Sequence, residues 1–232
     1  MRLSCPAIPH ATRRASVANA ARIELNIGGA PWRRFSCTAH DPVQKREPPS
    51  GVNWLHEVKF DGWRAQLHKH GDDVTIFSRN GRDYTRRFPP IRDSLISLAT
   101  TSAIIDAEIV VCDSEGKPDF KALMEGGTSE LCAWCFDLLA LKDCDYRERE
   151  LIERKLLLRK LLIKADNHRL RYSKEFPDPQ KLLAVCAKHD LEGIVSKLKL
   201  QPYCSGKNPS WVKVKTTAWR ETNRDRWELF TK

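Results

Sequence analysis

The sequence predicts an α+β domain in which mostly antiparallel sheets are flanked by helices. After residue 51 the chain changes to short segments of strand character that are broken by turns. These segments outnumber the helical ones, and short turns often join them, which favours direct antiparallel pairing. One of them, residues 104–112, is largely apolar with a carboxylate inside it, as expected of a strand that is buried on both faces.

The first half of the domain is predicted to be mostly strand. The GDD sequence at 71–73 is typical of a hairpin turn between two strands. A helix is expected to start at Pro89 or Pro90, because proline is tolerated in a first helical turn, and to end near Leu98. The strands of this half are expected at 54–60, 64–69 and 74–78.

The second half is predicted to alternate between strands and helices. Residues 147–164 have the pattern of a charged amphipathic helix. Asp178 and Pro179 have the residue types of an N-cap and a first helical position, for a helix that ends near His189. The strands of this half are expected at 104–112, 131–139, 193–197 and 211–215.

The composition is that of an ordinary soluble protein, with 41% hydrophobic and 30% charged residues among 232. No apolar run approaches the roughly 18 residues that a membrane helix needs, so no membrane partner is expected. Lys and Arg total 40 against 30 for Asp and Glu, and the formal charge of +10 favours a polyanionic partner. Charge alone leaves nucleic-acid binding undecided, because many basic proteins bind none.

The eight cysteines do not predict a disulfide scaffold in a chain of this length. The close pair Cys132 and Cys135 has no second pair or histidine cluster at zinc spacing. In a strand, Cys132 and Trp134 would share one face while Ala133 and Cys135 share the other, so ordinary packing is the favoured interpretation. We therefore expect reduced thiols and a cytoplasmic protein.

The start of the chain is expected to lie outside the folded domain. Residues 1–40 show no sustained periodicity and predict a poorly ordered or peripheral extension. The stretch PVQKREPPSG, which ends at Gly51, has the composition of a linker.

The segment EVKFDGWR carries charged side chains on one face of a predicted strand. Side chains alternate along a strand, so Glu57, Lys59 and Asp61 point the same way. This row is either a solvated edge of charges or part of a site. A site is favoured by Gly62, which permits close approach of the backbone, and by Arg64, whose guanidinium suits forked contacts with phosphate.

Two other acids lie within apolar strands. Glu108 in IIDAEIVV is costly to bury as an ion, so either a salt bridge to an arginine or a bound group would explain it. Asp137 repeats this pattern in FDLL. The preceding Phe136 either packs in the core or offers an apolar face to a ring.

Two further segments carry lysines at strand spacing. In LEGIVSK, alternation places Lys197 on the same face as Gly193 and places Glu192 on the opposite face. In WVKVK, Lys213 and Lys215 share a face. They are either exposed lysines that protect an edge strand from aggregation or cations that hold a ligand.

Together these groups supply what nucleotidyl transfer requires. A lysine nucleophile needs a partly deprotonated amine, which burial or neighbouring cations provide. A triphosphate needs cations, a hard divalent metal needs carboxylate oxygens, and an adenine ring needs an apolar face. The candidates are Lys197, Lys213 and Lys215 for the phosphates, Glu108 and Glu192 for the metal, and Phe136 for the ring.

In this order the segments resemble the motifs of the covalent nucleotidyltransferase superfamily. Within it the chain is most similar to ATP-dependent DNA ligases, especially the ligase domain of bacterial end-joining ligases and the short ligase-like proteins of rhizobia. A single Lys-x-Asp-Gly motif is weakly specific, whereas several motifs in family order, over residues 41–215, are strongly so. The motifs are KFDGWR at 59–64, SRNG at 78–81, DAEIV at 106–110, FDLL at 136–139, EGIVSK at 192–197 and WVKVK at 211–215.

The resemblance implies an adenylation domain over residues 41–215 and a role for each motif residue. Lys59 would attack the α-phosphorus of ATP, form a lysyl adenylate and pass AMP to a 5′-phosphate in nicked duplex DNA during repair or recombination. ATP would be the AMP donor, with Mg²⁺ or Mn²⁺ as the metal. The other implied roles are adenine recognition for Glu57 and Phe136, ribose binding for Arg64 and Glu108, contact with the α-phosphate for Lys213 and Lys215, metal binding for Glu192, and contact with the DNA backbone or 5′-phosphate for Arg79.

The chain departs from the family pattern in two places. Ala107 stands where the family usually has glycine, which matters only if the backbone there needs a positive φ. Residues 216–232 are too few for the oligonucleotide-binding (OB) fold that normally follows, so no OB-fold domain is expected, only a short charged, helical tail. The alternatives are therefore an adenylating or nick-binding half-enzyme that needs a DNA-repair partner to clamp DNA, or a relative that joins RNA ends.

Overall fold

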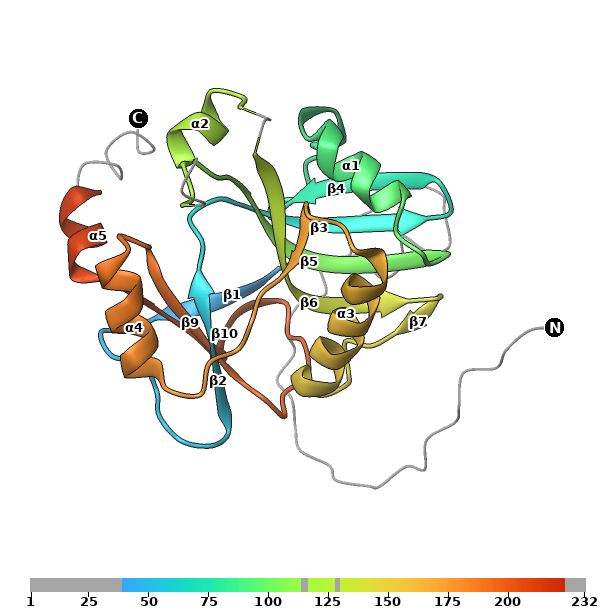
Figure 1. Ribbon diagram of the computed structural model, residues 1–232. Coiled ribbons are helices and arrows are strands. Elements are labelled where there is room, and N and C mark those ends of the chain that lie inside the picture. Colours follow the sequence, from blue (N-terminus) through green and yellow to red (C-terminus); the bar gives the residue numbers. More distant parts are fainter. Residues whose placement is uncertain (1–38, 114–116, 128–129, 224–232) are drawn as a thin grey trace, which may run out of the picture.

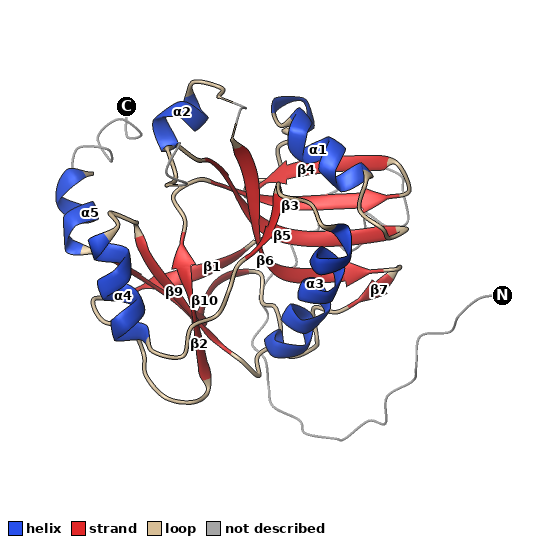
Figure 2. Ribbon diagram, viewed as in Figure 1, coloured by secondary structure: helices blue, strands red, loops and turns tan. Residues whose placement is uncertain are grey.

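The structure, a computed structural model, describes residues 39–113, 117–127 and 130–223. Residues 1–38 of the expected extension and 224–232 of the expected tail lie outside the described residues. Two sheets pack against each other, and helices cover their outer faces (Figures 1 and 2). This arrangement confirms the predicted α+β class.

The smaller sheet contains four strands, β1 (His40–Gln44), β2 (Trp54–Lys59), β9 (Gly193–Leu198) and β10 (Gly206–Lys215). Their spatial order is β1-β10-β9-β2. Strand β9 pairs antiparallel with both neighbours, whereas β1 pairs parallel with β10 and shifts register between Pro42 and Val43. The sheet therefore brings together segments from both ends of the described chain.

The larger sheet contains six strands, β3 (Trp63–His70), β4 (Asp73–Ser78), β5 (Ser102–Val111), β6 (Leu131–Leu141), β7 (Cys144–Asp145) and β8 (Leu170–Tyr172). Five of them pair antiparallel in the order β4-β3-β5-β6-β7, and β8 pairs parallel with β6. The predicted hairpin turn at 71–73 joins β3 to β4. The expectation of mostly antiparallel pairing is thus confirmed.

The helices in the described part of the chain are α1 (Pro89–Ile96), α2 (Phe120–Met124), α3 (Leu151–Ala165), α4 (Pro179–Lys188) and α5 (Thr217–Thr222), together with a 3₁₀ turn at Thr85–Arg87. Helices α1 and α3 cover the larger sheet, and α4 covers the smaller one (Figure 1). The predicted start of α4 is confirmed, because the Asp178 side chain accepts hydrogen bonds from the Gln180 and Lys181 amides. No helix within the described ranges is long and apolar enough to cross a membrane.

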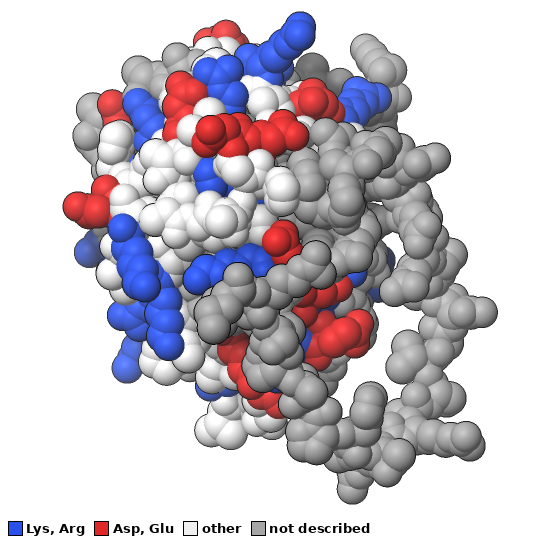
Figure 3. All heavy atoms as spheres, turned by 90° about the vertical axis from the view of Figure 1, so that its right-hand side faces the viewer, with Lys and Arg blue, Asp and Glu red and all other residues white. Residues whose placement is uncertain are grey.

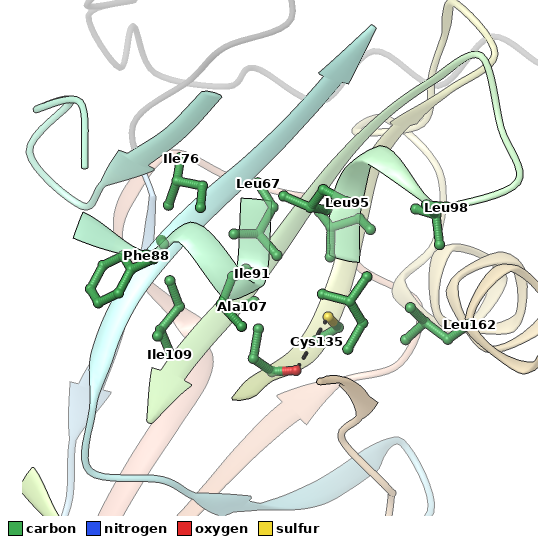
Figure 4. Close-up of a cluster of buried hydrophobic side chains, with 14 of the residues drawn as sticks. Leu67, Ile76, Phe88, Ile91, Leu95, Leu98, Ala107, Ile109, Cys135 and Leu162 are labelled. Atoms are coloured by element: carbon green, nitrogen blue, oxygen red, sulfur yellow. Dashed lines mark hydrogen bonds between the residues drawn. The ribbon is translucent and has the colours of Figure 1, made fainter. Parts of the chain in front are cut away.

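The main core lies between the larger sheet and helices α1 and α3 (Figure 4). Along β5, Ala107 and Ile109 point into this core, where they meet apolar side chains of α1 such as Ile91. Because strand side chains alternate, Asp106 and Glu108 point to the opposite face, toward the smaller sheet. The apolar packing of one face thereby fixes the position of two acids on the other.

A buried ion pair explains the acid within the FDLL motif. Arg154 of α3 donates from Nε and Nη2 to the two carboxylate oxygens of Asp137, each at 2.8 Å. Both side chains are 0% exposed. This forked contact ties α3 to β6 beside Phe136, and it compensates the cost of burying the carboxylate.

Two predicted boundaries of secondary structure were wrong. The linker expected to begin at Pro42 starts inside β1, because pairing with β10, distant in sequence, overrides the local turn signals. The helix expected from Arg147 begins at Leu151 instead, since Glu150 has extended backbone and Arg147 is held by the Asp145 carboxylate. The short elements β7, β8 and α2 were also not predicted.

The larger sheet shows how Ala107 and the cysteines of β6 are accommodated. Ala107 pairs with Ala65 of β3 and with Cys135 of β6, next to a register shift between Asp106 and Ala107, and it has no positive φ. Its methyl group therefore meets no requirement for glycine at this position. Cys132 packs beside Trp134, and Cys135 packs on the opposite face of β6, as alternation predicted. The thiols of Cys112, Cys132, Cys135, Cys186 and Cys204 form no disulfide.

Candidate active site

A cavity of about 690 Å³ lies between the two sheets. Strands β1, β2, β9 and β10 contribute to one side, and β3, β5 and β6 to the other. Most of the residues proposed from the sequence meet here, although they are far apart in the chain. The proposed residues that line the cavity are Glu57, Lys59, Arg64, Arg79, Glu108, Phe136 and Lys213.

Lys59 ends β2 and directs its ammonium into the cavity, where the side chain is 21% exposed. Its Nζ donates to Glu192 Oε2 at 2.6 Å. Burial alone would lower the pKa of Lys59, but the nearby charges of Glu192, Glu108 and Asp61 outweigh burial and raise it. The sequence argument expected burial or cations to deprotonate this amine, whereas the surrounding carboxylates favour its charged form.

Glu192 lies on the same side of the smaller sheet as Lys197, which corrects the prediction from strand alternation. The reason is that β9 begins only at Gly193, whose φ of +153° redirects the chain. A Cβ atom at Gly193 would lie 2.0 Å from the carbonyl oxygen of Val214 on the neighbouring strand. Glycine is therefore required at this position, and it turns the Glu192 carboxylate toward Lys59.

Lys215 is the second cation on the Glu192 carboxylate. Its Nζ lies 2.9 Å from Glu192 Oε1 and 3.8 Å from the ring centroid of Trp219 on α5. Glu192 thus bridges Lys59 and Lys215 with one oxygen each. A phosphate group, with its negative charge and several acceptor oxygens, has the chemistry to replace a carboxylate between two lysines.

Glu57 lies at the inner end of the cavity and is only 2% exposed. Its carboxylate is bound by Lys155 Nζ at 2.8 Å, Lys197 Nζ at 3.1 Å and the Ser173 hydroxyl at 2.8 Å. Burial lowers the pKa of Lys197 to about 8, although the Glu57 charge opposes the shift. The Lys197 ammonium, proposed from the sequence as a phosphate ligand, is not among the residues that line this cavity and lies 4.4 Å from the ring centroid of Phe136, which does line it.

Arg64 forms part of the wall opposite Lys59. Its Nε and Nη2 donate to the two oxygens of Asp106 at 3.0 and 2.7 Å, and its Nη1 donates to the His40 carbonyl. The Tyr203 hydroxyl donates to the same Asp106 carboxylate at 2.7 Å. The guanidinium, 5.1 Å from the ring centroid of Phe136, is therefore held in one orientation next to an aromatic face.

Glu108 differs from the other acids of the cavity. Among the described residues it has no cation within ion-pair distance, although Lys59 and Arg64 act on it through their charges. Burial raises the pKa of Glu108 to about 7, and these two cations only partly oppose the shift. The sequence left open whether an arginine or a bound group compensates this acid, and Arg64 is paired with Asp106 instead.

The outer end of the cavity carries two further cations and an acid. Arg79, which follows β4, donates from Nη2 to Asp41 Oδ2 at 2.9 Å. Lys213 Nζ lies 3.9 Å from Asp41 Oδ1. Burial lowers the pKa of Lys213, and the Asp41 charge opposes this shift.

Sequence reasoning missed three residues of this arrangement. Asp106 was within a quoted motif but received no role, although an acid two residues from Glu108 shares its face and could have been noticed. Lys155 lies in a helix rich in lysine and arginine, where no local signal distinguishes it. Asp41 is the first residue of the predicted domain and directly precedes the stretch that was interpreted as a linker, where no local signal distinguishes it.

One face of the molecule has no uniformly basic surface. On the face that lies to the right in Figure 1, acidic and basic side chains are interspersed (Figure 3). The electrostatic case for an anionic ligand therefore rests on the cations that converge on the cavity rather than on the overall charge of +10.

The fold and the cavity together define a nucleotidyltransferase domain of the DNA ligase type. The ligase domain of Mycobacterium tuberculosis LigD has a similar structure, with a TM-score of 0.68 and 29% identity over 77% of this chain and 60% of that one. Mycobacterial DNA ligase D complexed with ATP and MES has a TM-score of 0.61 and 28% identity, covering 75% of this chain and 60% of that one.

The sequence profile of the ATP dependent DNA ligase domain matches residues 43–215, so the chain belongs to this family. It is 36% identical over 174 residues to the multifunctional non-homologous end joining protein LigD of Pseudomonas aeruginosa, covering 73% of this chain. It is 30% identical over 231 residues to a probable DNA ligase of Mycolicibacterium gilvum, covering 90% of this chain. The matches span only 21% and 43% of the lengths of these two relatives.

Proposed function

We propose that this chain is an ATP-dependent DNA ligase whose cavity transfers AMP from ATP to Lys59 and then to a DNA 5′-phosphate. The observation that carries the proposal is the position of Lys59 at the cavity, with its Nζ 2.6 Å from Glu192 and with Lys215 on the same carboxylate. A nucleophilic amine thus lies where a second cation can hold the phosphate that it attacks.

In the first step the Lys59 amine attacks the α-phosphorus of ATP. The nitrogen–phosphorus bond forms, the bond to the pyrophosphate oxygen breaks, and the amine loses its proton. The neighbouring carboxylates raise the pKa of Lys59 and so favour its charged form, which cannot attack. The attack therefore requires that this effect on the pKa be reduced once the nucleotide and a metal ion are bound. Lys215 then holds the α-phosphate in place of Glu192, in keeping with the dominant part that positioning and charge play in phosphoryl transfer.

The residues present fit a divalent metal that is held jointly with the nucleotide. Glu108 and Glu192 are two of the carboxylates whose charges act on Lys59, and burial of Glu108 is compensated if a cation binds it. Mg²⁺ is commonly bound by one or two protein carboxylates together with substrate phosphates. Bound there, the ion would neutralise charge on the phosphates.

The inner end of the cavity supplies the contacts for the base and the sugar. The Glu57 carboxylate, bound by two lysines, is an acceptor for the exocyclic amine of adenine. Phe136 offers a face for stacking. Arg64 and Glu108 are adjacent on paired strands and would contact the ribose. Lys197 acts on Glu57 in this scheme and does not contact the phosphates.

The second and third steps require DNA. Arg79 at the outer end of the cavity would contact the 5′-phosphate or the backbone beside a nick, and the 3′-hydroxyl would displace AMP from that phosphate. Relatives named for non-homologous end joining support a role in joining DNA ends. We also propose a DNA-repair partner that helps to clamp the duplex.

A chase experiment tests the transfer to DNA. The protein is labelled with α-³²P-ATP and Mg²⁺, freed of nucleotide, and mixed with duplex that carries one nick with either a 5′-phosphate or a 5′-hydroxyl. We expect the label to move only to the 5′-phosphate strand and sealed product to follow. The label staying on the protein would contradict the DNA role, whereas transfer without sealing would assign the last step to a partner.

A further inference from the structure

We propose that Asp41 is a resident counter-anion which occupies a phosphate subsite between Arg79 and Lys213 and is displaced when a phosphate group binds. The inference rests on the proposed function and adds a residue, Asp41, that lowers the affinity of the same cavity for phosphate groups. Its ligand is a phosphate group, from either a DNA 5′-end or the nucleotide.

The contacts of Asp41 match those of a bound phosphate. One oxygen accepts a hydrogen bond from Arg79 at 2.9 Å, and the other lies 3.9 Å from the Lys213 ammonium. All three side chains line the cavity. Glu192 bridges Lys59 and Lys215 in the same way, so the cavity contains two pairs of cations that are each bridged by one carboxylate.

The position of Asp41 is fixed by the sheet rather than by a loose loop. The neighbouring His40 is 0% exposed and stacks on Trp211 at a centroid distance of 4.3 Å. Strand β1 is tied to β10 on both sides of Asp41, by the Gly206 amide bonding to the Ala39 carbonyl and by the pairing of Gln44 with Lys213. A carboxylate held by such a strand is pre-positioned between the two cations.

The side chains of Asp41, Arg79 and Lys213 are accessible to solvent, so a ligand can compete for the two cations. The side chains of Asp41 and Lys213 are each 25% exposed and that of Arg79 is 55% exposed, so water and ligand can reach them. The ion pairs are therefore weak enough to be exchanged, yet an incoming phosphate must compete with them. Asp41 reduces the repulsion between two neighbouring cations and lowers their affinity for adventitious anions.

The test compares wild type with Asp41→Asn, which keeps the shape but removes the charge. Asp93→Asn, at an exposed ion pair on α1 outside the cavity lining, is the matched control for net charge. Affinity is measured for nicked duplex with a 5′-phosphate, for the same duplex with a 5′-hydroxyl, and for an ATP analogue that resists cleavage between its α- and β-phosphates. Thermal melting checks that each variant is folded.

We expect Asp41→Asn to bind one phosphate ligand about five- to tenfold more tightly than wild type, while Asp93→Asn does not. A gain confined to the 5′-phosphate duplex identifies a DNA phosphate as the competitor, and a gain for the ATP analogue identifies a nucleotide phosphate. In an Arg79→Gln background the gain should disappear. Unchanged or weaker binding of both ligands by a folded Asp41→Asn variant overturns the inference.

Lys59 adenylation is measured on the same variants. If the wild-type protein is not adenylated on Lys59, this result contradicts the proposed function but leaves the inference about Asp41 standing. A phosphate-dependent gain in Asp41→Asn would still support the counter-anion, so the two failures are distinguishable.

Discussion

Substitution of Gly193 by alanine tests how the fold positions the Glu192 carboxylate. The new Cβ atom would lie 2.0 Å from the Val214 carbonyl oxygen and 2.8 Å from the Lys215 Cα atom, both of them backbone atoms of β10. Neither can move away as a flexible side chain could. The chain must therefore separate β9 from β10 or change the direction in which Glu192 points.

The expected cost has two parts. A non-glycine residue at a φ of +153° stores roughly 1–3 kcal/mol of backbone strain. The overlap with the neighbouring strand adds about 1–3 kcal/mol, as for overpacked cores. We therefore expect Gly193→Ala to lose about 2–6 kcal/mol of unfolding free energy in urea denaturation, together with most adenylation activity.

Gly71→Ala is the matched control. Gly71 also has a positive φ, of +59°, but a Cβ atom there meets nothing within 4 Å. This variant should lose only the strain of a left-handed residue, roughly 1–2 kcal/mol, and keep its activity. Equal losses in both variants, or normal adenylation by Gly193→Ala, would refute the argument that glycine positions Glu192.

Three further predictions concern single charges. Because the pKa of Glu108 is raised from 4.5 to about 7, its carboxyl contributes a penalty that grows as pH rises through this window, so Glu108→Gln should melt higher than wild type at pH 8 in EDTA and equally at pH 4. A constant difference at both pH values would contradict this. In Glu192→Gln the pKa of Lys59 should fall, and competitive acetylation of this lysine, followed by mass spectrometry, should show a lower midpoint pH than in wild type. Arg154→Met should cost about 3–5 kcal/mol in denaturant, since it leaves a buried carboxylate unpaired, whereas Arg92→Met at an exposed pair should cost under about 1 kcal/mol.

The elements that the sequence predicts well are those whose signals are local. Asp178 and Pro179 determine the start of α4 through a side-chain cap and a fixed φ, and neither depends on the rest of the fold. The apolar strand around Glu108 and the hairpin at 71–73 were predictable for the same reason. Most of the candidate site lies instead on or next to the strands β2, β6, β9 and β10. Its members could be named before their arrangement was known because their residue types and their order are visible in the sequence itself.

The features that the sequence does not predict depend on distant partners. Strand β1 exists because β10 offers it an edge, and its own residues resemble a linker. The direction of Glu192 depends on the conformation of Gly193, which periodicity does not reveal. The partner of Glu57 on α3, Lys155, is one cation among many in a charged helix until the helix is packed against the sheet.

The most direct test of the central claim is to locate the AMP. The protein is incubated with ATP and Mg²⁺, and the modified residue is mapped by peptide mass spectrometry, with Lys59→Arg compared with Lys160→Arg, at an exposed lysine of α3. We predict a single AMP on Lys59, absent from Lys59→Arg and unchanged in Lys160→Arg. AMP on another lysine, or no adduct on the folded wild-type protein, would contradict the account.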